Sequence, residues 1–331
     1  MNVTWLDPEQ LDPRDVAGAV AVLEAARVVD APHEMPITTS TFSTGLTYGW
    51  EGEPALGAVI RDAQARVAGV LQLTFPNRDN RHLGMADICV DPRARRQGLG
   101  QALYDASVVR TRAEGRTTLV TYSFDLPASV AFAKAMALER ASDEVQREQR
   151  LLELDWDRLD REQVAAVERS RDYELLAMPG ATPDDMVDAI VELSGAINDA
   201  PMDDLDIEDE VFSAERLRAF DQTQVLLRRR LYRLVARHRP TGALVGHTVV
   251  AVDQEQPWYA LQYDTSVLRS HRGHRLGLLL KVAMLRWLQT DEPQVRVLST
   301  WNAASNDHMV AVNEALGYEV VAGGIAWQRS I

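Results

Sequence analysis

The chain has 331 residues, 46% of them hydrophobic and 25% charged, which is the composition of an ordinary folded protein with room for two domains. Its formal net charge of −14 argues against a general nucleic-acid-binding protein and suits a neutral or cationic substrate. Because Cys89 is the only cysteine, neither an intrachain disulfide bond nor a cysteine zinc site can form.

The N-terminal residues lack the basic and apolar regions of a secretory signal, and no apolar run reaches the roughly 18 residues that span a membrane. We therefore expect a cytoplasmic protein without membrane contact. No group of histidine and carboxylate side chains has the spacing of metal ligands, so no metal is expected.

The hydrophobic pattern predicts a strand followed by an amphipathic helix at the start of each half of the chain, at residues 2–6 and 13–29 and again at 173–178 and 182–197. Two further strands are predicted at residues 231–238 and 243–252, joined by a Pro-Thr-Gly turn, and a hairpin over Gly323 and Gly324. Between the halves, a polar helical stretch is predicted as a linker. We expect an N-terminal domain at residues 1–156, a linker at 157–172 and a C-terminal domain at 173–331.

The sequence repeats itself at one constant offset. Residues 86–103 align without a gap with residues 263–280. In this alignment Asp87 meets Asp264, Val90 meets Val267, Leu99 meets Leu276 and Gly100 meets Gly277. An ungapped match of this kind predicts a tandem duplication of one domain.

A basic, glycine-containing loop stands between a predicted strand and a predicted helix in both copies. The N-terminus of a helix exposes unpaired N–H groups, which suit a pyrophosphate. The alternative is a surface helix whose arginines lie in solvent. The recurrence of the loop at the same junction favours phosphate binding, although neither copy has the sequence of a nucleotide P-loop or of a dinucleotide fingerprint.

The segment VDPRARRQGLGQAL resembles the acetyl-CoA signature of the GNAT N-acetyltransferase superfamily, Q/R-x-x-G-x-G/A, with Arg95, Gly98 and Gly100 at its defined positions. The second copy carries Arg272 and Gly277 but has Arg275 in place of the first glycine. Residues 300–320 also resemble the strand–helix segment of the family that ends in Gly-Phe or Gly-Tyr. Together the two copies extend the resemblance over the whole chain.

The resemblance implies an α/β (α+β) fold of two tandem GNAT-like domains, each a mixed, mostly antiparallel sheet flanked by helices, a layout similar to that of mycothiol synthase. It also implies acetyl-CoA as the co-substrate, held between splayed central strands. The residues expected to bind it are, in the second copy, Val267, Arg272, Gly273, His274, Arg275, Leu276, Gly277, Leu278 and Asn302, and in the first, Val90, Arg95, Arg96, Gln97, Gly98, Leu99 and Gly100.

Acetyl transfer to an amine requires a neutral amine and a proton for the leaving thiolate. By resemblance, a carboxylate on the central strand acts as the base, and we expect Asp264 in this role. The tyrosine that serves as general acid in many relatives is replaced by Asn313, and by Ala133 in the first copy. We expect Asn306 and Asn313 to belong to the catalytic site, although asparagine also favours helix N-caps.

The second copy is expected to be catalytic, since it holds the asparagine-rich segment, while the first binds acetyl-CoA idly or serves as a scaffold. The predicted function is an acetyl-CoA-dependent N-acetyltransferase that acts on the primary amine of a small molecule by direct attack in a ternary complex. The alternative is a non-catalytic acyl-CoA-binding protein. The acidic residues 203–210 either attract a cationic amine or form a solvated loop. The sequence predicts neither the acceptor nor the oligomeric state.

Overall fold

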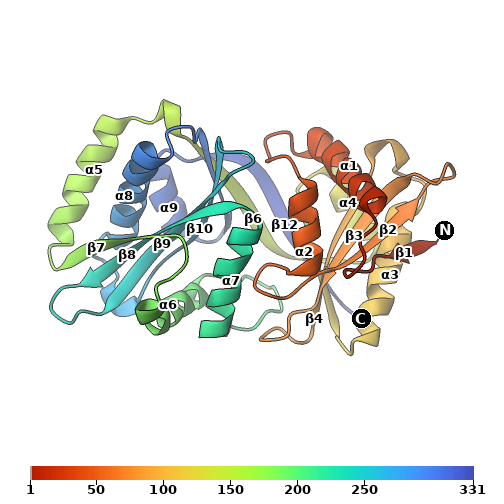
Figure 1. Cartoon of the computed structure of the whole chain (residues 1–331), viewed down its shortest axis with the longest axis horizontal. Helices are drawn as coiled ribbons and strands as arrows, with labels where there is room; N and C mark the ends of the chain where they lie inside the picture. The colour runs from red at the N-terminus through yellow and green to blue at the C-terminus, as the bar shows by residue number, and fades with distance from the viewer. Residues whose placement is uncertain (1) are drawn as a thin grey trace. The chain divides into compact units, whose positions relative to one another are not determined.

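The computed structural model describes residues 2–331, which form two compact units (Figure 1). The first unit comprises the chain up to Glu144, together with Met202–Asp209 and Ala322–Ile331. The second comprises Val145–Pro201 and Glu210–Val321. The predicted domains are each continuous in sequence, with a linker at residues 157–172 between them. The compact units differ, because each is made of segments that are separate in sequence.

The first unit is built on strands in the order β1-β2-β3-β4-β5-β12, antiparallel except for the parallel pair β4–β5. Its elements are β1 (Val3–Trp5), α1 (Pro13–Asp30), α2 (Thr39–Thr47), β2 (Leu56–Arg61), β3 (Val67–Thr74), β4 (Leu83–Val90), α3 (Leu99–Ala113), β5 (Thr118–Phe124), α4 (Pro127–Ala135), the start of β6 (Glu139–Arg150) and most of β12 (Glu319–Ser330).

The second unit repeats this arrangement, with strands in the order β6-β11-β10-β9-β8-β7 and one parallel pair, β10–β11. Its elements are the rest of β6, α5 (Trp156–Arg169), β7 (Tyr173–Pro179), α6 (Val187–Ser194), α7 (Ala214–Leu226), β8 (Arg229–His238), β9 (Leu244–Asp253), β10 (Tyr259–Val267), α8 (Leu276–Asp291), β11 (Val297–Ala303) and α9 (Asp307–Ala315). The predicted mixed, mostly antiparallel α/β fold is therefore confirmed.

Each sheet is covered by helices on both faces because successive side chains of a strand point to opposite sides. In the first unit Val59 and Val70 pack beneath α1 and α2, while their neighbours Ile60 and Leu71 pack against α3. The second unit has α6 and α7 on one face and α8, with α5 behind it, on the other. The stretch predicted as a linker is thus α5, a helix packed on α8.

The last strand belongs to the first unit. Residues Gly324–Ser330 of β12 pair with β5, and Ile325 and Trp327 enter the core beneath α3. The hairpin predicted over Gly323 and Gly324 is wrong, since β12 runs without interruption through both glycines. Continued pairing with β5 keeps this segment extended, and neither glycine has the positive φ that a tight turn requires.

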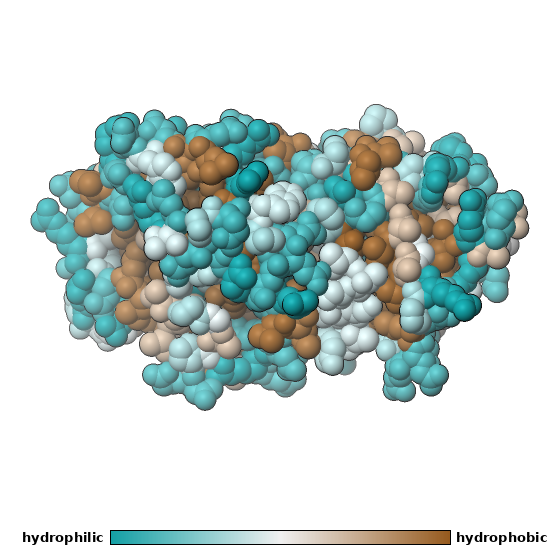
Figure 2. All heavy atoms as spheres, turned by 45° about the horizontal axis from the view of Figure 1, so that its top comes forward, coloured by the Kyte–Doolittle hydropathy of each residue, from teal (hydrophilic) through white to brown (hydrophobic). Residues whose placement is uncertain are grey.

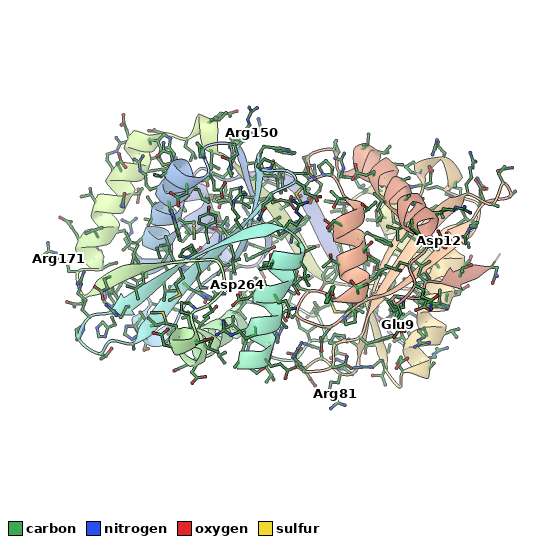
Figure 3. All side chains as sticks on the ribbon, viewed as in Figure 1. Glu9, Asp12, Arg81, Arg150, Arg171 and Asp264 are labelled. Atoms are coloured by element: carbon green, nitrogen blue, oxygen red, sulfur yellow. The ribbon has the colours of Figure 1, made fainter. Side chains whose placement is uncertain are left out.

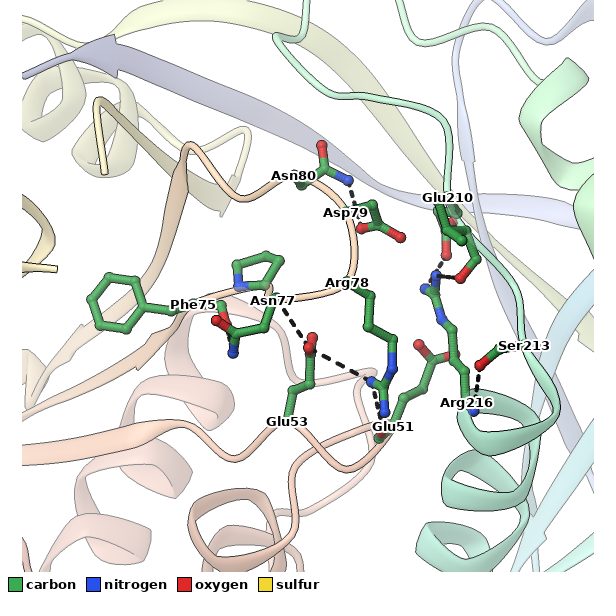
Figure 4. A network of polar contacts seen from close by, with 12 residues as sticks. Glu51, Glu53, Phe75, Asn77, Arg78, Asp79, Asn80, Glu210, Ser213 and Arg216 are labelled. Carbon is green, nitrogen blue, oxygen red and sulfur yellow. Dashed lines mark hydrogen bonds and ion pairs between the residues drawn. The ribbon is translucent and has the colours of Figure 1, made fainter. Parts of the chain in front are cut away.

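The acidic segment 203–210 is neither helix nor strand, and most of it is bound to the first unit. The side chain of Asn80 accepts from the Glu208 N–H at 2.7 Å, and the Glu208 carboxylate accepts from the Asn80 N–H at 3.0 Å. The Asp206 N–H donates to the side chain of Gln328 at 2.8 Å. The loop that carries Asn80 is itself tied back, because Arg78 donates to the Glu51 carbonyl at 2.9 Å (Figure 4).

The face drawn in Figure 2 is mostly hydrophilic, in keeping with a chain of which 25% is charged. Among the helices of residues 2–331, none is long and apolar enough to cross a membrane.

Candidate functional site

The central strands of the first unit separate after a short parallel contact. Strands β4 and β5 pair only from Leu83–Met85 to Thr118–Val120 and then diverge. A cavity of about 440 Å³ lies where they part, lined by the ends of both strands, the β4–α3 loop, α3 and α4. This volume lies within the usual range of small-molecule sites.

Most residues predicted to bind acetyl-CoA in the first copy meet at this cavity. Those that line it are Val90, Arg95, Arg96, Gly98, Leu99 and Gly100. Gln97 instead lines a second cavity of about 900 Å³ next to α1 and the β2–β3 turn. Several other residues line the cavity that were not predicted from the sequence, among them Thr121, Tyr122, Phe132 and Trp327.

The loop before α3 has the backbone of an anion-binding site. Gly98 is the N-cap residue with φ of 80°, and no side chain caps the helix. The first N–H groups of α3 are therefore left unpaired by side chains, at the positive end of the helix dipole. Gly100 allows the Phe132 ring to pack closely against this end of α3, because a Cβ at this position would lie only 3.1 Å from the ring.

The arginines of this loop have different partners. Arg95 forms an ion pair with Asp30, one of whose bonds measures 3.0 Å, and donates to the Val90 carbonyl at 3.3 Å. Arg93 pairs with Asp91 at 2.7 Å. Arg96, which has φ of 63° and is exposed, has no side-chain partner within residues 2–331. Arg96 is therefore the cation of this loop that is open to an anion.

Titratable groups with raised pKa values lie at the diverging strand ends. Asp87 keeps solvent-accessible surface, yet desolvation by the surrounding protein raises the pKa of its carboxyl to about 6. Desolvation, with smaller effects of Glu144 and Asp87, raises the pKa of Tyr122 to about 12. Each of these groups therefore becomes charged only at a higher pH than the free side chain does.

The single thiol is not part of this chemistry. Cys89 is partly buried, packs against the core beneath α1 and α2 and also lines the cavity, and desolvation raises its pKa to about 12. A thiol in this environment stays protonated near neutral pH and is a poor nucleophile.

The second unit has the same strand divergence but different contents. Strands β10 and β11 pair from Tyr259–Leu261 to Val297–Ser299, and beyond this the Thr300 hydroxyl donates to the Gln262 carbonyl at 3.3 Å. The asparagine predicted at the general-acid position, Asn313, is fully buried. It accepts from the Lys281 ammonium at 2.8 Å and donates to Asn302 at 2.9 Å.

The other predicted catalytic asparagine has a local partner. Asn306 is the N-cap residue of α9, and its side chain accepts from the Met309 N–H at 3.2 Å. The structure therefore brings Asn302 and Asn313 together and leaves Asn306 at the helix end. Tyr318 is buried in the core.

The basic loop of the second unit is occupied by the protein's own carboxylates. Arg272 and Arg269 both pair with Asp199, at 2.5 and 2.7 Å. Arg275, the N-cap residue of α8 with φ of 58°, pairs with Glu162 of α5 at 2.9 Å. These pairs neutralise much of the charge that a phosphate would meet.

Of the remaining predicted residues, the glycines shape the backbone of the loop and the apolar residues pack in or against the core. Gly273 has φ of 85° and Gly277 has open space where a Cβ would stand. The side chain of His274 lies near the Arg169 carbonyl, at 3.3 Å. Leu276 and Leu278 are buried in the core, and Val267 packs against it.

Asp264, the predicted base, lies on β10 in the second unit (Figure 3). Strand β10 is irregular against β9 between Gln262 and Thr265. Desolvation raises the pKa of Asp264 to about 6, with Glu210 adding to the rise and Arg233 opposing it. The two matched aspartates thus share a similar shift, and Asp264 has charged neighbours on the α7 side of the sheet.

Within the described chain, which lacks only residue 1, no three histidine, cysteine or carboxylate side chains are grouped so as to hold a metal ion.

Residues 24–137 match the family model of the Acetyltransferase (GNAT) family. A tandem GNAT protein from the clavulanic acid biosynthesis pathway, solved without acetyl-CoA, is 29% identical, with 99% of this chain and 98% of that chain aligned and a TM-score of 0.79. No curated protein sequence matches the chain.

Two further solved structures show the fold alone. The GCN5-related N-acetyltransferase from Sphaerobacter thermophilus is 14% identical, with 99% of this chain and 95% of that chain covered and a TM-score of 0.68. The glucosamine N-acetyltransferase region of a fungal multi-domain GH3 β-N-acetylglucosaminidase is 12% identical, with a TM-score of 0.69. There the alignment covers 99% of this chain and 38% of the other.

Proposed function

Given that the chain is a tandem-domain member of the GNAT superfamily, we propose that it is an acetyl-CoA-dependent N-acetyltransferase whose first unit binds the acyl-CoA. The observation that carries this proposal is the cavity at the divergence of β4 and β5, which opens beside the uncapped N-terminus of α3. The acceptor is a small-molecule primary amine, and the site of action is the cytoplasm.

The residues of the first unit fit acyl-CoA by their chemistry. The free N–H groups of α3 and the guanidinium of Arg96 suit a pyrophosphate. Apolar walls that include Val90 and Phe132 suit the less polar pantetheine arm. When bound, acyl-CoA supplies the thioester that the amine attacks directly, without a covalent enzyme intermediate.

The chain's own groups then handle the proton of the amine. Asp87, matched to Asp264 in the repeat, is the proposed base of the first unit, because it stands on β4 where the strands diverge. A carboxyl with a pKa near 6 is mostly ionised at neutral pH and is a stronger base than a free aspartate. Asp264, with Asn302 and Asn313 nearby in the second unit, remains the competing proposal.

The test is a calorimetric titration of acetyl-CoA into the intact chain and into two matched variants. Gly100→Glu introduces a side chain toward Phe132 and a negative charge at the N-terminus of α3, so we expect binding to be lost. Gly277→Glu makes the same change at the second unit, and we expect it to leave binding intact.

Loss of binding in Gly277→Glu alone would move the cofactor to the second unit. No binding to the unaltered chain would reject the acetyltransferase. Tight binding without release of free CoA thiol across a panel of amines would favour the non-catalytic acyl-CoA-binding protein.

A further inference from the structure

The second unit places polar side chains where the first unit has an apolar core. Three directly paired residues cross β2, β3 and β4 of the first unit, in the order Val59, Val70 and Cys89. All three pack in or against the core beneath α1 and α2. The strand register of the first unit therefore shows that this fold can fill these positions with apolar side chains.

The same register in the second unit crosses β8, β9 and β10 through Val235, His247 and Ser266. His247 is 2% exposed and Ser266 is 8% exposed. Two residues before Val235, on the same face, stands Arg233, which is 4% exposed. Its counterpart by strand register in the first unit is Gly57.

Helix α7 adds two more polar side chains on this face of the sheet. Asp221 is 4% exposed, and its carboxylate accepts from the Thr182 N–H at 2.8 Å. Gln224 is 1% exposed. Arg233 donates to the Thr182 hydroxyl at 2.6 Å, so Arg233 and Asp221 share Thr182 as a partner, one through its side chain and the other through its backbone. We call Arg233, His247, Ser266, Asp221 and Gln224 the polar layer.

The polar layer is incompletely hydrogen-bonded. The buried atoms without a partner are Arg233 Nε, both ring nitrogens of His247, Ser266 Oγ, Asp221 Oδ1 and Gln224 Nε2. Buried polar atoms in folded proteins almost always have partners, and leaving one unpaired destabilises the fold. Six such atoms lie on one side of one sheet. The matching strand positions of the first unit hold apolar residues or glycine instead, so we infer that the partners of the six atoms come from outside the chain.

The unpaired atoms define the chemistry of those partners. Arg233 and Gln224 offer N–H donors and Ser266 a hydroxyl, which together suit a carboxylate. Asp221 offers a free carboxylate oxygen, which suits an ammonium. The nearby Arg216 is already engaged by Glu210 (Figure 4). Arg233 and Arg229, on the same face of β8, each keep an Nε without a hydrogen bond, and Arg233 is the one next to Val235 and His247 in the strand register.

We propose that the polar layer binds a small zwitterion that carries a carboxylate and an ammonium, such as an α-amino acid. The carboxylate lies at Arg233, Gln224 and Ser266, and the ammonium lies at Asp221. Because the polar atoms are enclosed, α7 must shift to admit the ligand. The segment before it, residues 200–213, forms no helix or strand, and its hydrogen bonds to Asn80 and Gln328 limit how far it can move. The site is separate from the acyl-CoA cavity, so it stands or falls independently of the proposed function.

The experiment measures amino-acid binding to the intact chain without acyl-CoA, by thermal unfolding and calorimetry, across the protein-forming amino acids. We expect at least one to raise the unfolding temperature. His247→Val and Ser266→Ala replace two residues of the polar layer with apolar ones, like those at the matching positions of the first unit. We expect each to weaken binding about tenfold or more while leaving the ligand-free unfolding temperature unchanged or higher. Thr265→Val, on the opposite face of β10, is the control and keeps full binding.

A structural role predicts the opposite pattern. If no amino acid binds, and His247→Val and Ser266→Ala both lower the ligand-free unfolding temperature, the polar layer serves the fold and the proposal is overturned. Acetate and methylamine are included as half-molecule probes. Binding of acetate as tight as that of any amino acid would overturn the zwitterion and identify a simple anion site.

Discussion

At the scale of single residues, the duplicated aspartates show how one sequence position acquires different surroundings. Asp87 and Asp264 occupy the same place on matched strands, and desolvation raises both pKa values to about 6. Asp264 lies within the electrostatic influence of Arg233 and Arg216. Asp87 has no such arginine, so its basicity is set by desolvation alone.

The pH dependence of the reaction tests the role of Asp87. Because the carboxylate is the active form of a base, kcat/KM should rise with pH through a midpoint near 6 and level off above it. Asp87→Asn should lower kcat/KM by roughly 10²–10⁴-fold and remove this acidic limb. A steady-state pH profile of CoA thiol release measures both effects. If Asp264→Asn produces this pattern and Asp87→Asn does not, catalysis belongs to the second unit.

At the scale of elements, α8 and α9 are joined by a buried cation. Lys281 of α8 is 3% exposed, donates to Asn313 of α9 and lies over the Tyr318 ring, 4.7 Å from its centre. Burial lowers the pKa of this ammonium to about 7. The polar residues that resemble catalytic groups in the sequence therefore connect two helices inside the second unit.

The lowered pKa of Lys281 makes the stability of the fold depend on pH. Between the folded pKa near 7 and the ordinary value of 10.5, the unfolded chain binds more protons than the folded chain, so the free energy of unfolding rises with pH. From pH 7 to pH 9 the contribution is about 2 kcal/mol. Lys281→Met should remove this rise, as measured by urea unfolding at both pH values.

The chain's other lysine, the exposed Lys134, supplies the control, since Lys134→Met should leave the rise unchanged. A rise that persists in Lys281→Met would mean that Lys281 keeps its ordinary pKa in the folded protein.

At the scale of the whole molecule, a segment from near residue 330 completes the sheet of the first unit. The strand that borders β5 in the first unit is made of residues 324–330, and Trp327 both fills the core and lines the cavity where β4 and β5 diverge. A unit built from distant parts of the chain cannot be completed until residues 322–331 have been made. This couples the first unit's cavity to that segment.

A fragment that ends at residue 156 tests this coupling. It lacks β12, so the edge of β5 is unpaired and the core beneath α3 loses Ile325 and Trp327. We expect the fragment to be largely unfolded and to bind no acetyl-CoA, as seen by circular dichroism and calorimetry. Attaching residues 322–331 through a flexible linker should restore both. A fragment that folds and binds without them would show that β12 is dispensable.

The sequence by itself predicted the class of fold and the place of the basic, glycine-containing loop. Hydrophobic periodicity and the ungapped match of residues 86–103 with 263–280 are local properties, so they predict the strand–loop–helix unit in both copies. The mixed, mostly antiparallel fold was implied by the resemblance of residues 95–100 to the GNAT signature, and it is confirmed. Tyr122 was within reach as well, since it takes the place of Asn302 when Ala133 is matched to Asn313.

Only the tertiary structure shows which arginines of the two loops are paired with carboxylates. Periodicity cannot tell that Glu162 and Asp199 reach the arginines of the second loop, or that Lys281 meets Asn313, because these partners are far apart in sequence. Nor can it tell that Gly323 and Gly324 lie within a strand, since glycine permits a turn and pairing with β5 overrides that freedom. Local patterns determine elements, and long-range contacts determine which of their polar groups remain free for a ligand.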